Sequence, residues 1–193
     1  MNENVNTKVI VPARLSYVHV WEPTANADNT EKKYSVSLII PKSDKESLAK
    51  IKKTLEAAIE LGVQTKFNGK KPANLKLPVR DGDTERSEDE AYKDSYFINA
   101  SAKTKPGVLN PDKTIMTKED DLYSGCYAWV SLTLFPFAAH GNNGIAAGLN
   151  NIMKIKDGEP LGGHSTAESD FADIPGAEND PLGSIVEEDN PLF

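Results

Sequence analysis

The sequence predicts a mainly β domain, a small closed barrel with one helix and long loops, followed by a disordered acidic C-terminal tail. Five segments show the alternating or apolar patterns of strands, and one segment has helical spacing. The charge is also divided along the chain, whose 193 residues carry −7 in total. Residues 1–163 hold 22 basic and 21 acidic residues, whereas residues 164–193 hold eight acidic and no basic ones. This division predicts a folded domain over 1–163 and a flexible tail over 164–193.

Composition limits the setting of the protein. The single cysteine, Cys126, excludes an intrachain disulfide and fits a reducing compartment. The N-terminus lacks the basic start and apolar run of a signal peptide. The most apolar stretch, residues 126–139, is too short and too polar to span a bilayer. We therefore expect a soluble, cytoplasmic protein with no membrane partner.

The first two strands are expected over residues 9–20 and 34–40. Residues 9–20 are rich in Val, Ile and Leu, and Pro12 within them predicts a bend or bulge. Residues 34–40 alternate cleanly, with Ser35 and Ser37 on the face opposite the apolar side chains. Pro41 ends this second strand.

One helix is expected over about residues 44–61. Ser43 and Glu46 have the spacing of a capping box, in which each side chain satisfies an amide of the first turn. Apolar residues follow at helical spacing, and Gly62 stands where a C-terminal cap belongs. The helix therefore packs one apolar stripe on the domain.

Three further strands are expected over residues 96–102, 123–137 and 144–155, with a hairpin turn at Gly141-Asn-Asn-Gly144 between the last two. Residues 62–94 and 106–122 show no sustained periodicity and are expected to be loops. The order strand, strand, helix and three strands fits a barrel of the OB type with its helix shifted from the usual place. A β-sandwich is the alternative.

The strand over 123–137 carries the best candidate for a binding face. Side chains alternate across a strand, so Cys126, Ala128, Val130, Leu132 and Leu134 share one apolar face that suits a barrel interior. The opposite face carries aromatic and hydroxyl side chains: Tyr127, Trp129, Ser131, Thr133, Phe135 and Phe137. Bases of single-stranded nucleic acid stack on exposed aromatics, while lysines and hydroxyls bind phosphates.

Other segments could complete such a face. Phe97, Lys103 and Lys105 belong to the outward face of the earlier strand and have the same character. The basic segment 66–80 supplies Lys71, Lys76 and Arg80 as an electrostatic track. The competing interpretations are that a helix or loop covers the aromatics, and that the basic segment is a solubilising loop.

The chain shows little sign of catalytic or cofactor chemistry. The three histidines are scattered, and neither a phosphate-binding loop nor a dinucleotide fingerprint is present. Asp81 and Asp83 are close enough in sequence to suggest a metal loop, but a solvated acidic loop is the simpler interpretation. We therefore expect no enzyme activity, no metal and no cofactor.

The tail combines acids with an apolar tip. Residues 164–193 hold eight carboxylates, and the last of them, Asp189, lies close to the apolar residues Leu192 and Phe193. Such a polyanion can occupy the basic groove of its own domain, and its tip can dock on a partner protein. A simple solubility tail is the alternative, although solubility does not require an apolar tip.

Several blocks of sequence, in the right order over nearly the whole chain, resemble a family of phage single-stranded-DNA-binding proteins formerly described as a domain of unknown function. The blocks are Tyr34-Ser-Val-Ser-Leu-Ile-Ile-Pro-Lys-Ser-Asp44, Asn74-Leu-Lys-Leu-Pro-Val-Arg-Asp-Gly-Asp83, Tyr96-Phe-Ile-Asn-Ala-Ser-Ala-Lys-Thr-Lys-Pro-Gly107, Tyr123-Ser-Gly-Cys-Tyr127, Gly144-Ile-Ala-Ala-Gly-Leu-Asn-Asn151 and Asp157-Gly-Glu-Pro-Leu-Gly-Gly163. The resemblance implies an OB fold, sequence-independent binding of single-stranded DNA, and a role in phage replication or recombination within the cytoplasm of an infected bacterial host.

Three hypotheses follow. The first is a non-enzymatic single-stranded-DNA-binding protein whose tail competes with DNA or recruits replication and recombination proteins. The second is an acidic adaptor or DNA mimic that binds a replication or nuclease partner instead of DNA. The third is a metal-dependent nuclease centred on Asp81 and Asp83. The net charge of −7 does not exclude the first, because the folded part is nearly neutral.

Overall fold

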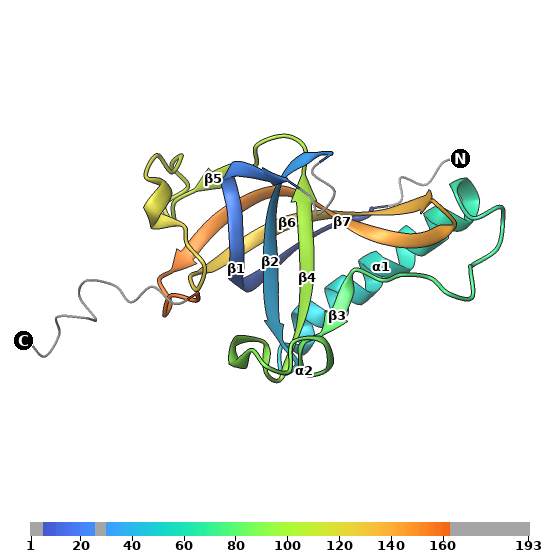
Figure 1. The fold of residues 1–193 in the computed structure, drawn as a ribbon, viewed down its shortest axis with the longest axis horizontal. Helices are drawn as coiled ribbons and strands as arrows, with labels where there is room; N and C mark the ends of the chain where they lie inside the picture. Colours follow the sequence, from blue (N-terminus) through green and yellow to red (C-terminus); the bar gives the residue numbers. More distant parts are fainter. Residues whose placement is uncertain (1–5, 26–29, 163–193) are drawn as a thin grey trace, which may run out of the picture. The chain divides into compact units, whose positions relative to one another are not determined.

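Five strands close a barrel around an apolar core (Figure 1). The computed structural model describes residues 6–25 and 30–162, and the barrel lies within the unit Met1–Gly162. The barrel strands are β1 (Lys8–Ala25), β2 (Lys32–Pro41), β4 (Ser95–Ala102), β6 (Tyr127–Ala139) and β7 (Asn142–Lys156).

The pairing pattern confirms the predicted OB-type barrel. Strands β1–β2, β2–β4, β1–β6 and β6–β7 are antiparallel neighbours. The barrel closes where β4 and β7 run parallel, with Ala100 opposite Ala147 and Ser101 opposite Gly148. One closed barrel, with its helix between β2 and the next strand, replaces the two packed sheets of a sandwich.

The core contains the apolar face predicted for β6. Cys126, Ala128, Val130, Leu132 and Leu134 have no exposed surface, and they pack against inward residues of β1, β2, β4 and β7. Burying a side chain the size of Val or Leu contributes about 1.5–3 kcal/mol. This face therefore contributes strongly to barrel stability.

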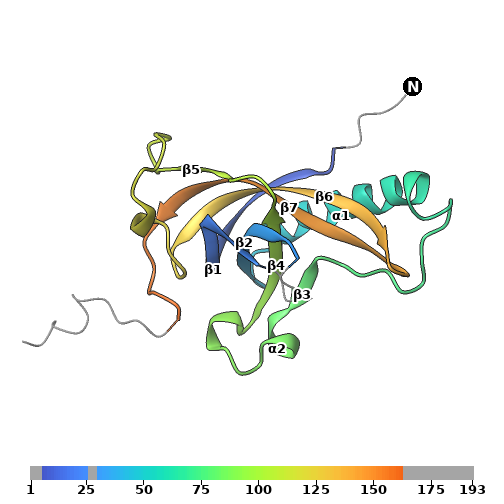
Figure 2. The ribbon, with the colours of Figure 1, turned by 45° about the horizontal axis from the view of Figure 1, so that its top comes forward.

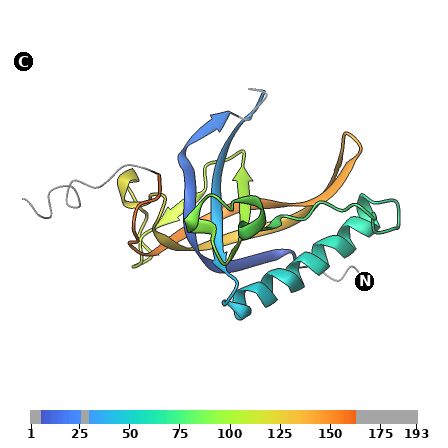
Figure 3. The same cartoon turned by 60° about the horizontal axis from the view of Figure 1, so that its bottom comes forward.

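Helix α1 (Lys45–Thr65) packs against β1 and β6, as Figure 3 shows. The predicted N-cap is wrong by one residue, because the Asp44 side chain accepts a hydrogen bond from the Ser47 amide. Gly62 is not the C-terminal cap either. The helix continues to Thr65, and Gly62 is buried in it where the ring of Phe67 lies too close for a Cβ.

Strand β1 is not bulged at Pro12, contrary to prediction. Pro12 pairs in register with Trp129, and the register shift with β2 comes between Ser16 and His19, where Tyr17 has φ 47°. Leu15 donates its amide to the carbonyl of Cys126, the residue just before β6, so the nitrogen of Pro12 points to the β2 side. Pairing with β2 begins only at Arg14, and the missing N–H therefore costs no ladder bond.

The two long segments predicted as loops contain short elements. Residues 62–94 include β3 (Val79–Asp81), α2 (Gly82–Glu85) and the short 3₁₀ helix η1 (Glu90–Tyr92), with β3 added to the edge of β4. Residues 106–122 include β5 (Gly107–Leu109), parallel to β7, and the 3₁₀ helix η2 (Glu119–Asp121). No helix among the described residues is long and apolar enough to cross a membrane.

The β6–β7 hairpin extends past the barrel beside α1 (Figure 2). Its turn lies two residues earlier than predicted, because Ala139 pairs with Asn142. His140 and Gly141 both have positive φ, 51° and 76°, while Asn143 and Gly144 already belong to β7. Two residues of positive φ match the twist of a two-residue hairpin turn.

Candidate nucleic-acid interface

The outer face of β6 presents the predicted aromatic residues. Trp129 is 39% exposed and Phe135 is 44% exposed, and both point away from the barrel interior. Trp129 lies between Pro12 of β1 and Met153 of β7 in the pairing register. Neither the helix nor a long loop buries these two side chains.

Small residues on β7 let the aromatic rings lie across the sheet. A Cβ at Gly148 would stand 3.3 Å from Cε1 of Phe135, and one at Gly144 would stand 2.7 Å from Cε1 of Phe137. The rings therefore cover these two glycines, and a larger residue at either position would lift them. This explains why glycine occupies positions 144 and 148.

The hydroxyls between the aromatics are already engaged. The Nδ2 atom of Asn150 donates to Oγ1 of Thr133 at 3.0 Å and to Oγ of Ser131 at 3.4 Å. Asn150 stands at a register shift of β7, and Ser131 is buried. These groups stabilise the strand pair and leave stacking and cation contacts as the chemistry that this face offers.

Two cations flank Tyr127, which is half-buried at one end of the face. The guanidinium of Arg14 and the ammonium of Lys156 lie 5.9 Å and 5.0 Å from its ring centroid. Arg14 is held by hydrogen bonds to the carbonyl oxygens of Gly125 and Glu159, at 3.2 Å and 2.8 Å. Sequence spacing did not indicate Arg14 or Lys156, because only the strand register brings them beside Tyr127.

Exposed apolar side chains continue this face across the neighbouring strands. Ile10 on β1 is 51% exposed and pairs with Ser131, while Leu109 of β5 pairs with Met153. Ile115, 77% exposed, lies opposite Leu109. The loop containing β5 shows no periodicity, so the sequence did not indicate this extension.

Phe97, which was predicted to belong to the binding face, is fully buried. Tyr92 of η1 meets it edge-on at 5.1 Å between ring centroids, and the guanidiniums of Arg80 and Arg86 lie over it at 5.2 Å and 5.8 Å. The expectation that Phe97 is exposed is wrong. Arg80 is also ion-paired with Glu85.

The remaining predicted lysines lie in two separate places. Lys103 pairs with Glu31 at 2.7 Å, which lowers the pKa of that carboxyl, and the Lys105 ammonium lies 5.3 Å from the Trp21 ring centroid. Lys71 and Lys76 are exposed on the loop after α1. The backbone of Lys76 joins the edge of β7, donating to the Asn143 carbonyl at 2.9 Å.

The acidic pair Asp81 and Asp83 is bound by a lysine. The ammonium of Lys42 lies 2.8 Å from Oδ1 of Asp81 and 2.6 Å from Oδ2 of Asp83. Hydrogen bonding to Lys42 lowers the pKa of Asp83, so the carboxylate stays ionised. The described part of the chain contains no group of three potential metal ligands, and this corner is held by an ion pair.

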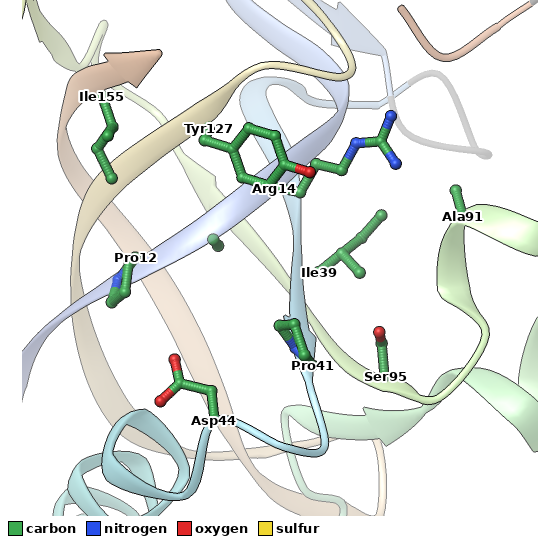
Figure 4. Close-up of a pocket in the computed structure, with 10 residues that line it drawn as sticks. Pro12, Arg14, Ile39, Pro41, Asp44, Ala91, Ser95, Tyr127 and Ile155 are labelled. Atoms are coloured by element: carbon green, nitrogen blue, oxygen red, sulfur yellow. The ribbon is translucent and has the colours of Figure 1, made fainter. Parts of the chain in front are cut away.

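A cavity of about 300 Å³ opens beside Tyr127, where β1 and β2 diverge (Figure 4). Its walls come from β1, β2, β4, β6, β7, η1 and the start of α1. Most of its lining is apolar, but it also includes Tyr127, Arg14, Asp44 and Ser95.

The predicted tail residues Asp189, Leu192 and Phe193 lie outside the described residues.

Comparison with known proteins identifies the family. Residues 5–182 match the family model described as Enterobacter phage Enc34, ssDNA-binding protein. The protein p50 of Acyrthosiphon pisum secondary endosymbiont phage 1 is 26% identical over 176 residues, which cover 88% of this chain and 94% of p50.

Solved structures agree with the barrel. The single-stranded-DNA-binding protein of bacteriophage Enc34, in complex with single-stranded DNA, is 28% identical, with a TM-score of 0.70 over 81% of this chain and 90% of that one. The gp2.5 protein of bacteriophage T7, 18% identical, shares the fold with a TM-score of 0.54 over 90% of this chain and 98% of that one. The chain therefore belongs to the Enc34-type family of phage single-stranded-DNA-binding proteins.

Proposed function

We propose that this chain binds single-stranded DNA without a fixed sequence and protects it during phage DNA replication or recombination in the cytoplasm of the host. The observation that carries this proposal is the exposure of Trp129 and Phe135 on one strand face, with basic side chains around them. The Enc34 relative, crystallised with single-stranded DNA, supports the same activity.

The strand of DNA is expected to run along the outer face of β6. Trp129 and Phe135 are six residues apart, or about 20 Å along a strand, so several nucleotides can span them. Each aromatic that stacks a base contributes about 1–3 kcal/mol. Tyr127 lies one step beyond Trp129 and completes the row.

Phosphates are expected to meet the cations beside this row. Arg14 and Lys156 flank Tyr127, Lys8 is exposed on β1 opposite Thr133, and Lys76 lies at the hairpin end beyond Phe135. Lys71, Lys103 and Lys105 extend the positive potential on either side. The Lys103–Glu31 pair is exposed and therefore weak, so a phosphate can replace the carboxylate.

The acidic tail supplies a second part of the proposal. Residues 164–193 carry eight carboxylates and no Lys or Arg, so they can occupy the basic surface around the outer face of β6 when DNA is absent. The apolar tip at Leu192 and Phe193 can instead engage a replication or recombination protein. Both roles follow from charge and composition.

One titration tests the proposed function. The full chain is titrated with single-stranded and double-stranded oligonucleotides of equal length at two salt concentrations, with tryptophan fluorescence as the signal. We expect preferential binding of the single strand, quenching, and weaker binding at high salt. An adaptor or DNA mimic would show no affinity for either, and this result would overturn the proposal.

A further inference from the structure

The cavity beside Tyr127 has the size and lining of a small ligand site. Its volume of about 300 Å³ is at the lower end for small-molecule pockets. Pro12, Ile39, Pro41 and Ile155 give it apolar walls, and Figure 4 shows them around one open space with Asp44 and Tyr127. The two prolines and the divergence of β1 from β2 explain why no ladder fills this space.

Asp44 is the acceptor that this cavity offers. Its Oδ1 atom accepts from the Ser47 amide at 3.1 Å as the cap of α1, and this bond uses only part of its capacity. Hydrogen bonds from Ser47 lower the pKa of the carboxyl, which keeps it ionised and unable to donate. Two other polar groups of the lining already have partners, because Ser95 donates to the Lys93 carbonyl at 3.0 Å and Arg14 donates to two carbonyls. The Tyr127 hydroxyl also belongs to the lining, but it carries no charge.

The cavity lies on the path proposed for the DNA. Tyr127 lines it and stands two residues from Trp129 on the same face, or about 7 Å away. That separation is about twice the rise between stacked bases, so adjacent nucleotides of an extended strand can reach both places. The phosphate between them would pass near Arg14 and Lys156.

We propose that this cavity holds one nucleobase of the bound strand and favours bases with an exocyclic amino group over thymine or uracil. The amino group of cytosine, adenine or guanine donates to the Asp44 carboxylate. Thymine and uracil instead present a carbonyl oxygen at the position of cytosine's amino group, which the carboxylate repels, and their one donor on that edge is the ring N3–H beside it. This inference rests on the proposed binding of single-stranded DNA. It adds a preference at one nucleotide to otherwise sequence-independent binding.

The Asp44 carboxylate also disfavours the chain's own residues Leu192 and Phe193 as the occupant of the cavity. Leu192 and Phe193 fit an apolar cavity, but they follow three acids at 187–189. Placing these charges beside ionised Asp44 is unfavourable. An uncharged base with a donor group matches the lining better.

The test compares oligo(dC) with oligo(dU), which differ in the group at position 4 and in the ring nitrogen beside it. In the full chain we expect dC to bind several-fold tighter, up to about tenfold, as one hydrogen bond to a charged group allows. Asp44→Ser retains an N-cap side chain but removes the carboxylate, so the dC:dU affinity ratio should fall toward one. Asp112→Ser is the matched control, because Asp112 also caps a turn, at Thr114, but lies outside the cavity.

A second variant fills the cavity without altering its charge. Ala91→Leu places a larger side chain in the wall formed by η1 and should lower affinity for oligo(dC) more than for oligo(dU). Ala49→Leu adds the same group on the exposed side of α1 and should change neither affinity. Thermal unfolding of each variant checks that the fold is intact.

The results distinguish a nucleobase in the cavity from occupation by the tail and from a lack of DNA binding. A dC:dU ratio that Asp44→Ser leaves unchanged overturns the nucleobase pocket while single-strand binding stands. Tighter binding of both oligonucleotides by Ala91→Leu overturns it in favour of the tail tip, which the new side chain would displace. Failure of the unaltered chain to bind either oligonucleotide overturns the proposed function itself.

Discussion

At the scale of single residues, Trp129 is the side chain that the proposed interface requires most. It is 39% exposed, has neighbours on both adjacent strands, and lies between Tyr127 and the row that ends at Phe135. Trp129→Ala should weaken single-strand binding by about 1–3 kcal/mol, or roughly 5- to 150-fold, because one stacking platform is lost. Fluorescence anisotropy of a labelled oligonucleotide measures the change.

Two control variants separate stacking from general damage. Trp129→Phe keeps an aromatic face and should retain most of the affinity. Tyr17→Ala removes an aromatic side chain that is 50% exposed but does not belong to the outer face of β6, and it should have little effect. Equal binding by Trp129→Ala and the unaltered chain would remove Trp129 from the interface.

At Gly62 the neighbouring ring of Phe67 reverses the usual preference of a helix for alanine over glycine. Within an exposed helix, Gly→Ala stabilises by about 1 kcal/mol. A Cβ on Gly62 would instead overlap the ring of buried Phe67, so Gly62→Ala should destabilise the fold by about 1–3 kcal/mol in urea unfolding. In a Phe67→Ala background the same change should be neutral or stabilising, and a loss of equal size there would show that the ring is not responsible.

At the scale of elements, the ion pairs of Lys42 tie α2 and the start of β4 to the end of β2. Lys42 binds Asp81 and Asp83, and Oδ1 of Asp83 accepts from the Asp94 amide at 2.9 Å. The pKa of Asp83 is lowered in the folded protein, so its contribution to stability is present above its usual pKa near 3.8. That contribution is lost as pH falls further, through the folded value.

Unfolding temperatures between pH 7 and pH 3 test this coupling. Asp83→Asn should remove part of the loss of stability below about pH 4, since the variant has no proton to bind there. Asp120→Asn, an exposed carboxylate of η2, should leave the pH profile of the unaltered chain in place. Identical profiles for the unaltered chain and Asp83→Asn would show that the ion pair contributes nothing measurable.

The elements also show what sequence patterns can predict. The five barrel strands and the inward face of β6 were predictable, because side-chain alternation is a local property. Alternation also placed Phe97 outward correctly, but it could not show that Tyr92, Arg80 and Arg86 would cover it. That cover comes from a segment without periodicity, folded back over β4.

The site shows the same limit. The aromatic residues of β6 were found from one strand, whereas Arg14, Lys156 and Met153 join them only through pairing with β1 and β7. The capping residue of α1 was missed by one position, because Ser43 and Asp44 are both good caps and only the geometry of the first turn selects Asp44. Residue spacing along the chain shows neither how distant strands pair nor which of two adjacent capping residues the helix uses.

At the scale of the whole molecule, the charge is divided between the acidic segment 164–193 and the rest of the chain. The chain carries −7, but the eight acids after Gly163 exceed that total, and the part that includes the barrel carries +1. An acidic segment attached to the same chain would be present at high local concentration whether or not DNA is there. It should therefore weaken DNA binding without any contact specific to one residue.

Truncation after Gly163 tests this competition. The shortened chain should bind single-stranded DNA more tightly than the full chain, and the difference should shrink as salt rises from about 0.05 to 0.3 M, because salt screens tail and DNA alike. A full-length variant with all eight tail acids changed to Asn or Gln should behave like the truncated chain if charge alone is responsible. If only the truncation tightens binding, the apolar tip at Leu192 and Phe193 competes instead, and Phe193→Ala should reproduce the effect. Equal affinities for all forms at every salt concentration would show that the tail does not compete with DNA, which leaves recruitment of a partner protein and simple solubility as its roles.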